Sequence, residues 1–199
     1  MRAWMAIGVE VVFFALAFGL RCWVQYRRTG SSGFILPSRD ARGPEQVASG
    51  LFVVGLVAIL GAPIADLAGL GRIDLMDGRV LGVVGAVLAL VGIGLCLWAQ
   101  FAMGASWRIG VDPDEVTDLV TAGPFARVRN PIFSAMVVAV LGFFLLVPNF
   151  VAAAAVVALI VGLEAQVRWV EEPYLRSVHG ASYDRYWQRA GRFVPGVGR

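Results

Sequence analysis

A polar, basic segment at residues 117–133 lies between long apolar runs and holds the residue types best suited to binding a charged ligand. Pro131, with Asn130 before it, predicts the start of a helix, because proline suits the first helical position and asparagine suits the N-cap. The amides at such a helix start can bind an anionic group such as a carboxylate. The plainer alternative is a capped helix flanked by Arg127 and Arg129.

A second charged segment, residues 168–186, contains the acidic pair Glu171 and Glu172. At an exposed helix start this pair could simply favour the positive end of the helix dipole. If it faces the basic loop, the pair offers carboxylates for a cation while arginines hold an anion, and a ligand that carries both charges would fit. His179 is the only histidine, so no Ser–His–Asp set forms without it. No cluster has the spacing of metal ligands, and no Gly-rich phosphate loop is present.

The elements that must position these segments are membrane helices. Hydrophobic residues make up 58% of the chain and its mean hydropathy is +0.74, and the apolar runs reach about 20 residues, the length that spans a bilayer. We therefore predict an all-α integral membrane bundle of about five transmembrane helices, plus a C-terminal interfacial helix. The predicted spans are residues 4–26, 46–70, 80–103, 131–147 and 150–167. Pro148 and Asn149 predict the turn between the last two.

We expect one membrane domain over residues 1–199. Its parts are three N-terminal spans (1–103), a polar loop (104–130), a helical hairpin (131–167) and a C-terminal helix with its tail (168–199). A helix over 171–190 should lie along the membrane surface, because aromatic side chains such as Tyr183 and Trp187 suit the interface.

All 17 cationic side chains are arginines, and the net charge is +3. Five spans would put 14 of them on one side of the membrane and three on the other. Because cytoplasmic loops are rich in basic residues, the N-terminus should lie outside, with the C-terminus, the polar loop and the site in the cytoplasm. Arginines beside apolar runs favour membrane lipids, not nucleic acid, as partners. Cys22 and Cys96 are too few for a disulfide framework. The oligomeric state stays open.

The sequences LVTAGPF at 119–125 and VRNPIF at 128–133, followed by Glu171–Glu172, resemble the cofactor motif of the isoprenylcysteine carboxyl methyltransferase family. Gly180, Tyr183, Tyr186 and the closing Phe193-Val194-Pro195 fit the same pattern, and the resemblance covers about residues 106–195. It implies an integral membrane methyltransferase that uses S-adenosylmethionine. The polar loop and the C-terminal helix would enclose this cofactor, and a lipophilic substrate would enter sideways between helices.

By position, the resemblance implies cofactor binding by Thr117, Leu119, Val120, Phe125, Asn130, Pro131, Ile132, Phe133, Glu171 and Glu172. Arg168 lies one residue after the place of the arginine that orients the substrate carboxylate in that family, and it is the catalytic candidate. Asn130 stands where the family usually has histidine, Phe133 where it has tyrosine, and Thr117 where histidine is common.

The expected activity is methyl transfer to a lipophilic acceptor, with a carboxylate ahead of a lipid amine. A carboxylate is already ionised at neutral pH and needs no general base, so positioning and exclusion of water can carry catalysis. Two other classes stay open. One is an NADPH-dependent reductase resembling the membrane sterol reductases, and the other is a non-enzymatic membrane protein with a degenerate pocket.

Overall fold

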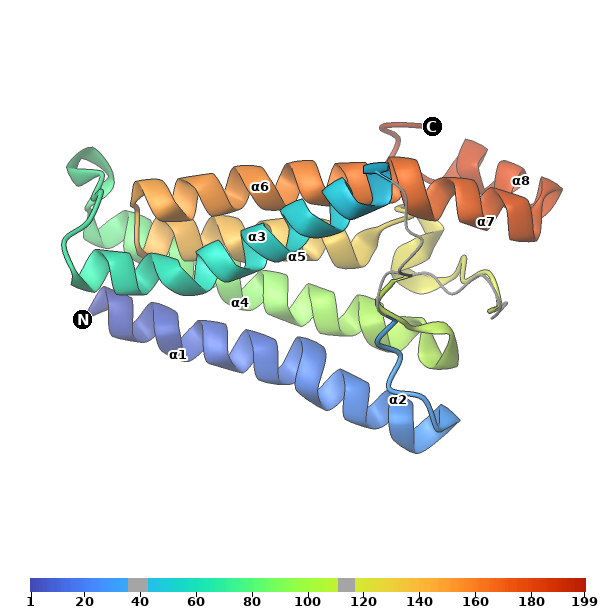
Figure 1. Cartoon of the computed structure of the whole chain (residues 1–199), viewed down its shortest axis with the longest axis horizontal. Helices are drawn as coiled ribbons and strands as arrows, with labels where there is room; N and C mark the ends of the chain where they lie inside the picture. The colour runs from blue at the N-terminus through green and yellow to red at the C-terminus, as the bar shows by residue number, and fades with distance from the viewer. Residues whose placement is uncertain (36–42, 111–116) are drawn as a thin grey trace.

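The computed structural model describes residues 1–35, 43–110 and 117–199. Its long helices run along one axis, with the N-terminus at one end and α7, α8 and the C-terminus at the other (Figure 1). The α-helices are α1 (Arg2–Phe14), α2 (Arg21–Thr29), α3 (Gly43–Leu67), α4 (Arg79–Ala102), α5 (Pro131–Leu146), α6 (Phe150–Gln166), α7 (Glu172–His179) and α8 (Ala181–Arg189). π-helical turns at Ala15–Leu20 and Val167–Glu171 join α1 to α2 and α6 to α7.

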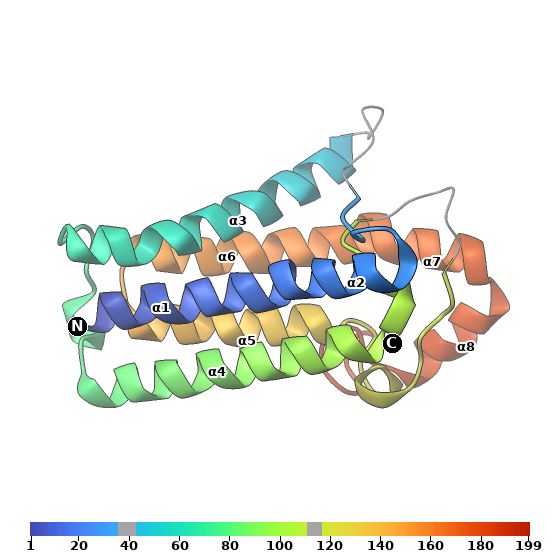
Figure 2. The same cartoon turned by 90° about the horizontal axis from the view of Figure 1, so that it is seen from below.

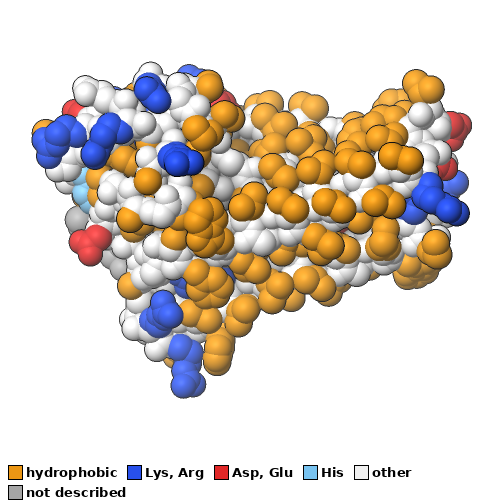
Figure 3. All heavy atoms as spheres, turned by 180° about the vertical axis from the view of Figure 1, so that it is seen from behind, with side chains coloured by type: hydrophobic (Ala, Val, Ile, Leu, Met, Phe, Trp, Pro, Cys, Tyr) orange, Lys and Arg blue, Asp and Glu red, His pale blue; other side chains and the backbone are white. Residues whose placement is uncertain are grey.

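Four helices within the described residues are long and apolar enough to cross a membrane: Arg2–Thr29, Gly43–Leu67, Arg79–Ala102 and Phe150–His179. The apolar α5 is shorter, and its 16 residues extend about 24 Å against a hydrocarbon core of about 30 Å. Apolar side chains cover the long helices on the face seen in Figure 3, and arginines gather at the ends. The predicted all-α membrane bundle is confirmed.

The turn predicted at Pro148 and Asn149 is also confirmed, since α5 ends at Leu146 and α6 begins at Phe150. The buried Asn149 side chain accepts a hydrogen bond from the amide of Ala152 at 2.9 Å, which caps α6. Its Nδ2 donates to the carbonyl of Ala62 at 2.9 Å. One asparagine therefore closes the hairpin and ties it to α3.

The C-terminal helix differs from the prediction. Helix α6 continues through the π turn into α7 and ends at His179, so the last span is one helix that reaches beyond the predicted boundary. The chain then breaks at Gly180, which has a φ of +50° that glycine adopts at little cost, and α8 begins at Ala181. The prediction of one helix over 171–190 was therefore wrong at Gly180.

The bundle is built from two closely packed pairs, α4 with α5 and α3 with α6. A Cβ at Gly92 of α4 would lie 2.4 Å from the backbone nitrogen of Ala139 in α5. One at Gly162 of α6 would lie 2.6 Å from the backbone nitrogen of Phe52 in α3. Such contacts need small residues, as is usual between membrane helices. Towards its N-terminal end α3 diverges from α6 (Figure 2).

A buried arginine holds the end of α4, where the polar loop begins. Arg21 donates to Gln25 Oε1 at 3.0 Å and to the carbonyl of Gly104 at 2.6 Å, and its guanidinium lies 4.5 Å from the Trp107 ring centroid. Gln25 donates to the carbonyl of Ala105 at 2.7 Å. Arg21 is fully buried and ties α2 to the start of the polar loop.

Candidate active site

The cofactor motif predicted around Asn130 lies against the C-terminal tail. The amide of Arg129 donates to the carbonyl of Gly191 at 2.8 Å, and the amide of Gly191 donates to the carbonyl of Arg127 at 3.0 Å. A Cβ at Gly191 would lie 1.9 Å from the carbonyl oxygen of Val194, so only glycine fits there. Two segments about 60 residues apart in the sequence are thus joined by main-chain hydrogen bonds at the start of α5.

The helix starts at Pro131 with Asn130 at the N-cap position, as predicted, but the Asn130 side chain makes no capping hydrogen bond. Its Nδ2 instead donates to the carbonyl of Arg192 at 3.1 Å. Across the described residues, the amides of Ile132 and Phe133 have no hydrogen-bond acceptor. The first turn of α5 therefore keeps two donors available for an anionic group.

A buried ion-pair network joins this helix start to the acidic pair. Glu172 Oε1 accepts from Arg129 at 2.9 Å and from Arg192 at 2.8 Å, and Oε2 accepts from Arg192 at 2.9 Å. Both carboxylate oxygens of Glu172 therefore bind arginine. Removing one member of such a buried network leaves an uncompensated charge and costs about 3–5 kcal/mol.

Arg129 also binds α8 and the tail. Its guanidinium donates to the carbonyls of Trp187, Ala190 and Gly198, and lies 4.5 Å from the Trp187 ring centroid. A planar guanidinium suits this role because it presents several donors in one fork. Arg129 is therefore the residue on which the motif, α7, α8 and the tail converge.

Two buried tyrosines connect α8 to the polar loop. The Tyr186 hydroxyl donates to the carbonyl of Phe125 at 2.7 Å, in the 3₁₀ turn Gly123–Ala126. Leu119 packs against Tyr183 and Tyr186. Burial, with a smaller contribution from the charge of Glu172, raises the pKa of Tyr183 to about 12, and burial also raises the pKa of Tyr186. Both phenols are therefore neutral at physiological pH.

Glu171, the other member of the acidic pair, lies in the π turn and is half-buried. Three residues further along the helix, the Tyr174 hydroxyl accepts a hydrogen bond at 3.0 Å from Arg108, at the entry of the polar loop. Unlike that of Glu172, the side chain of Glu171 forms no hydrogen bond within the described part of the chain.

Arg168 lies on the outer side of this network. Its Nε donates to Glu164 one turn earlier, and Arg192 Nη1 lies 3.8 Å from the same carboxylate. Charges thus alternate without a break from Arg168 through Glu164, Arg192 and Glu172 to Arg129.

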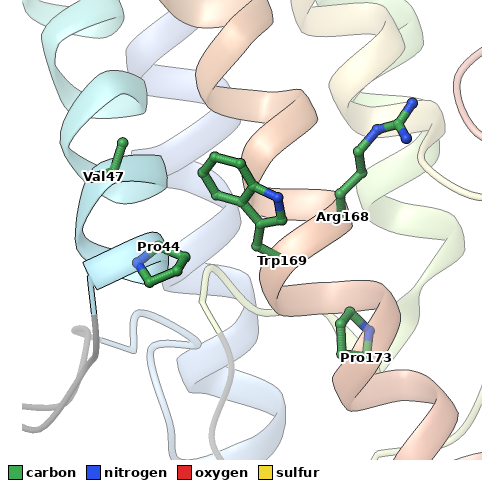
Figure 4. Close-up of a pocket in the computed structure, with 5 residues that line it drawn as sticks. All are labelled: Pro44, Val47, Arg168, Trp169 and Pro173. Carbon is green, nitrogen blue, oxygen red and sulfur yellow. The ribbon is translucent and has the colours of Figure 1, made fainter.

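A largely apolar groove of about 580 Å³ opens where α3 diverges from α6, lined by Pro44, Val47, Arg168, Trp169 and Pro173. Trp169 lies in it between the two helices, whereas the guanidinium of Arg168 points away from Trp169 and Pro44 (Figure 4). Arg168 therefore borders the groove, but its guanidinium group lies outside it, beside Glu164.

A family profile described as phospholipid methyltransferase matches residues 80–182, more than half of the chain. This chain belongs to the phospholipid methyltransferase family. No curated protein matches the chain significantly. A solved structure, the eukaryotic intramembrane Ras methyltransferase ICMT (isoprenylcysteine carboxyl methyltransferase), superposes with a TM-score of 0.70 at 17% sequence identity. The match covers 100% of this chain and 69% of that one, so the two share a fold. The predicted resemblance is confirmed.

In this phospholipid methyltransferase family member, the predicted site residues fall into three groups. Of the motif residues, Leu119, Phe125, Asn130 and Pro131 lie on or beside the contact with the C-terminal helices and tail, whereas Ile132 and Phe133 pack against the bundle core. Glu171 and Glu172 lie at the same end of the bundle, and Arg168 faces outward. Thr117 and Val120 are half-buried, next to residues 111–116 of the polar loop, which lie outside the described residues. Binding roles for all of these residues stay predictions.

Sequence reasoning gave no site role to Arg108, Arg129, Arg192 or Trp187, although all four organise the site. The arginines of the loop were expected to hold an anion as a group, and no single one was assigned a partner. The one available signal was the position of Arg129 inside the motif itself.

Proposed function

We propose that this protein transfers a methyl group from S-adenosylmethionine to a lipophilic acceptor, with a carboxylate as the preferred acceptor. The observation that carries the proposal is the buried pair of Arg129 with Glu172. This pair brings the open amides of α5 and the half-buried Glu171 to one end of the bundle. We take the 199 residues to act as one membrane domain.

The groups at this end fit the polar parts of the cofactor. The amides of Ile132 and Phe133 would bind its carboxylate, and Glu171 would bind its amino group through a charge-assisted hydrogen bond. Thr117, Leu119, Val120 and Phe125 would line its less polar parts, together with the Asn130–Pro131 turn. Glu172 would act at one remove, since its oxygens hold Arg129 and Arg192. Bound S-adenosylmethionine would supply an electrophilic methyl group on a sulfonium.

The acceptor preference is supported by the state of the two phenols and by the position of the histidine at this end of the described structure. Tyr183 and Tyr186 are neutral and hydrogen-bonded or buried, and His179 ends α7 away from the ion-pair network. An ionised carboxylate needs no deprotonation, whereas an ammonium does. Arg168 would hold the acceptor carboxylate, and the groove between α3 and α6 would admit its lipophilic part from the membrane.

The runner-up is methylation of a phospholipid amine, which the description of the matching family favours. Detergent-purified protein should bind S-adenosylmethionine but not NADPH in calorimetry. With labelled cofactor it should methylate a prenylated cysteine or a long-chain fatty acid faster than phosphatidylethanolamine. The reverse order would assign the phospholipid amine. Binding of NADPH alone by folded protein would refute the proposal and indicate a reductase.

We further propose that the site faces the cytoplasm, supported by the arginine asymmetry. A single cysteine at Ser182, in a variant lacking Cys22 and Cys96, should react with an impermeant maleimide only after the cells are opened. Labelling of intact cells would reverse the orientation.

A further inference from the structure

The pair of Glu164 with Arg168 holds a cation away from an apolar groove that the same arginine borders. Arg168 lines the groove with Trp169 and Pro173, yet its guanidinium is drawn back along α6 to Glu164 (Figure 4). An arginine stem has several rotatable bonds with staggered minima. Release from Glu164 would therefore let the guanidinium turn towards the groove.

The pair of Glu164 and Arg168 is the most solvent-exposed contact of the charge chain. Side-chain exposure falls inward from 52% at Arg168 and 37% at Glu164 to 11% at Arg192, 6% at Glu172 and 2% at Arg129. Solvent screens the outer pair, and such pairs contribute about 0–1 kcal/mol, whereas the inner pairs resist opening. An entering anion would thus compete only with the outermost contact.

Opening this pair would not leave Glu164 without a partner. Arg192 Nη1 lies 3.8 Å from its carboxylate, within reach of a small side-chain adjustment. The displaced carboxylate keeps a cation beside it, so the cost of releasing Arg168 stays low. An anion can therefore displace Glu164 from Arg168 while the inner ion pairs stay intact.

We infer that Glu164 is a specificity-determining residue that keeps Arg168 turned away from the groove until the anionic group of a lipophilic acceptor displaces it. This inference rests on the proposed function and concerns how its acceptor site selects an anionic acceptor over a neutral one. An anionic acceptor replaces Glu164 as the ion-pair partner of the Arg168 guanidinium. A neutral lipophile of equal length cannot displace Glu164 and gains only apolar contact.

The test compares palmitate with hexadecanol, a neutral molecule of the same chain length, bound to the whole protein in phosphatidylcholine nanodiscs without cofactor. Glu164→Gln should bind palmitate about two- to fivefold more tightly than wild type, the gain expected when a competitor worth up to about 1 kcal/mol is removed. Hexadecanol affinity should not change. Equal or weaker palmitate binding by Glu164→Gln would overturn the inference, as would equal tightening for both ligands.

A matched control exists in the pair of Arg176 with Asp184, which is 51% and 50% exposed and does not line the groove. Asp184→Asn removes one negative charge from the same end of the molecule and should leave palmitate affinity unchanged. If it tightens binding as much as Glu164→Gln, the effect is general electrostatics and the inference is wrong. Thermal unfolding of both variants should match wild type.

A second arm separates an acceptor from a bulk anionic lipid. Replacing a third of the phosphatidylcholine by phosphatidylglycerol should leave palmitate affinity within twofold. Strong competition would assign the site to membrane lipid and overturn the acceptor role. Because the assay needs no methyl transfer, its result stands even if no acceptor is methylated. Conversely, turnover of a carboxylate with no effect of Glu164→Gln would refute this inference alone.

Discussion

Glu172→Gln should release the C-terminal tail from the cofactor motif. The change keeps the shape of the side chain but removes the charge that pairs with Arg129 and Arg192, which lie 2.9 and 2.8 Å from Oε1. The nearly buried Arg129 would then lack a counter-charge, and Arg192 would keep only Glu164 at 3.8 Å, at a cost of about 3–5 kcal/mol. Since 1.4 kcal/mol is a factor of ten, the opening equilibrium should rise by roughly a hundredfold to several thousandfold.

Hydrogen–deuterium exchange measures this opening directly. The reporters are the amides of Arg129, Asn130 and Gly191, which bond across the contact between motif and tail. The protection factors of these amides should fall as much as the opening equilibrium rises, while the protection factors of amides in α4 should not change. Asp184→Asn, which breaks an exposed pair worth at most about 1 kcal/mol, should change them less than tenfold. Protection within tenfold of wild type in Glu172→Gln would refute the claim that this network holds the tail.

Three further outcomes are expected. Glu171→Ala should weaken S-adenosylmethionine binding in calorimetry by roughly ten- to a hundredfold, and Asn130→Ala by a smaller factor. Neither variant should change thermal unfolding. Unchanged affinity in both would remove the two residues from the cofactor site. Arg168→Gln should leave that affinity intact and raise the KM for an acidic acceptor about tenfold; lost cofactor binding would contradict its assigned role. Because burial raises the pKa of Tyr183 to about 12 from an ordinary 10, its stabilising contribution is complete below pH 10 and falls by about 2 kcal/mol as the pH rises to 12. Alkaline unfolding of Tyr183→Phe should lack this loss.

The site residues differ in how far the sequence alone could predict them. Pro131 at a helix start and the turn at Asn149 follow from local rules, because proline and asparagine have positional preferences that act within one turn of chain. The fate of the Asn130 side chain did not follow, since its partner is a carbonyl 62 residues away. Glu171 and Glu172 are adjacent and chemically identical, yet one has both oxygens bound to arginine and the other is half-buried beside Arg108.

Composition and apolar run length determined the membrane bundle, because a chain in lipid must satisfy its backbone hydrogen bonds within helices and needs about 20 apolar residues to cross. The motif residues and the arginine asymmetry also predicted the end of the bundle at which we propose the site. Only the tertiary structure decided which charges pair. The energy of an ion pair depends on distance and burial, and Arg129, Glu172 and Arg192 meet only when α5, α7 and the tail have packed together. The direction of the Arg168 guanidinium was decided in the same way, by a carboxylate one helical turn away and a groove formed where α3 diverges from α6.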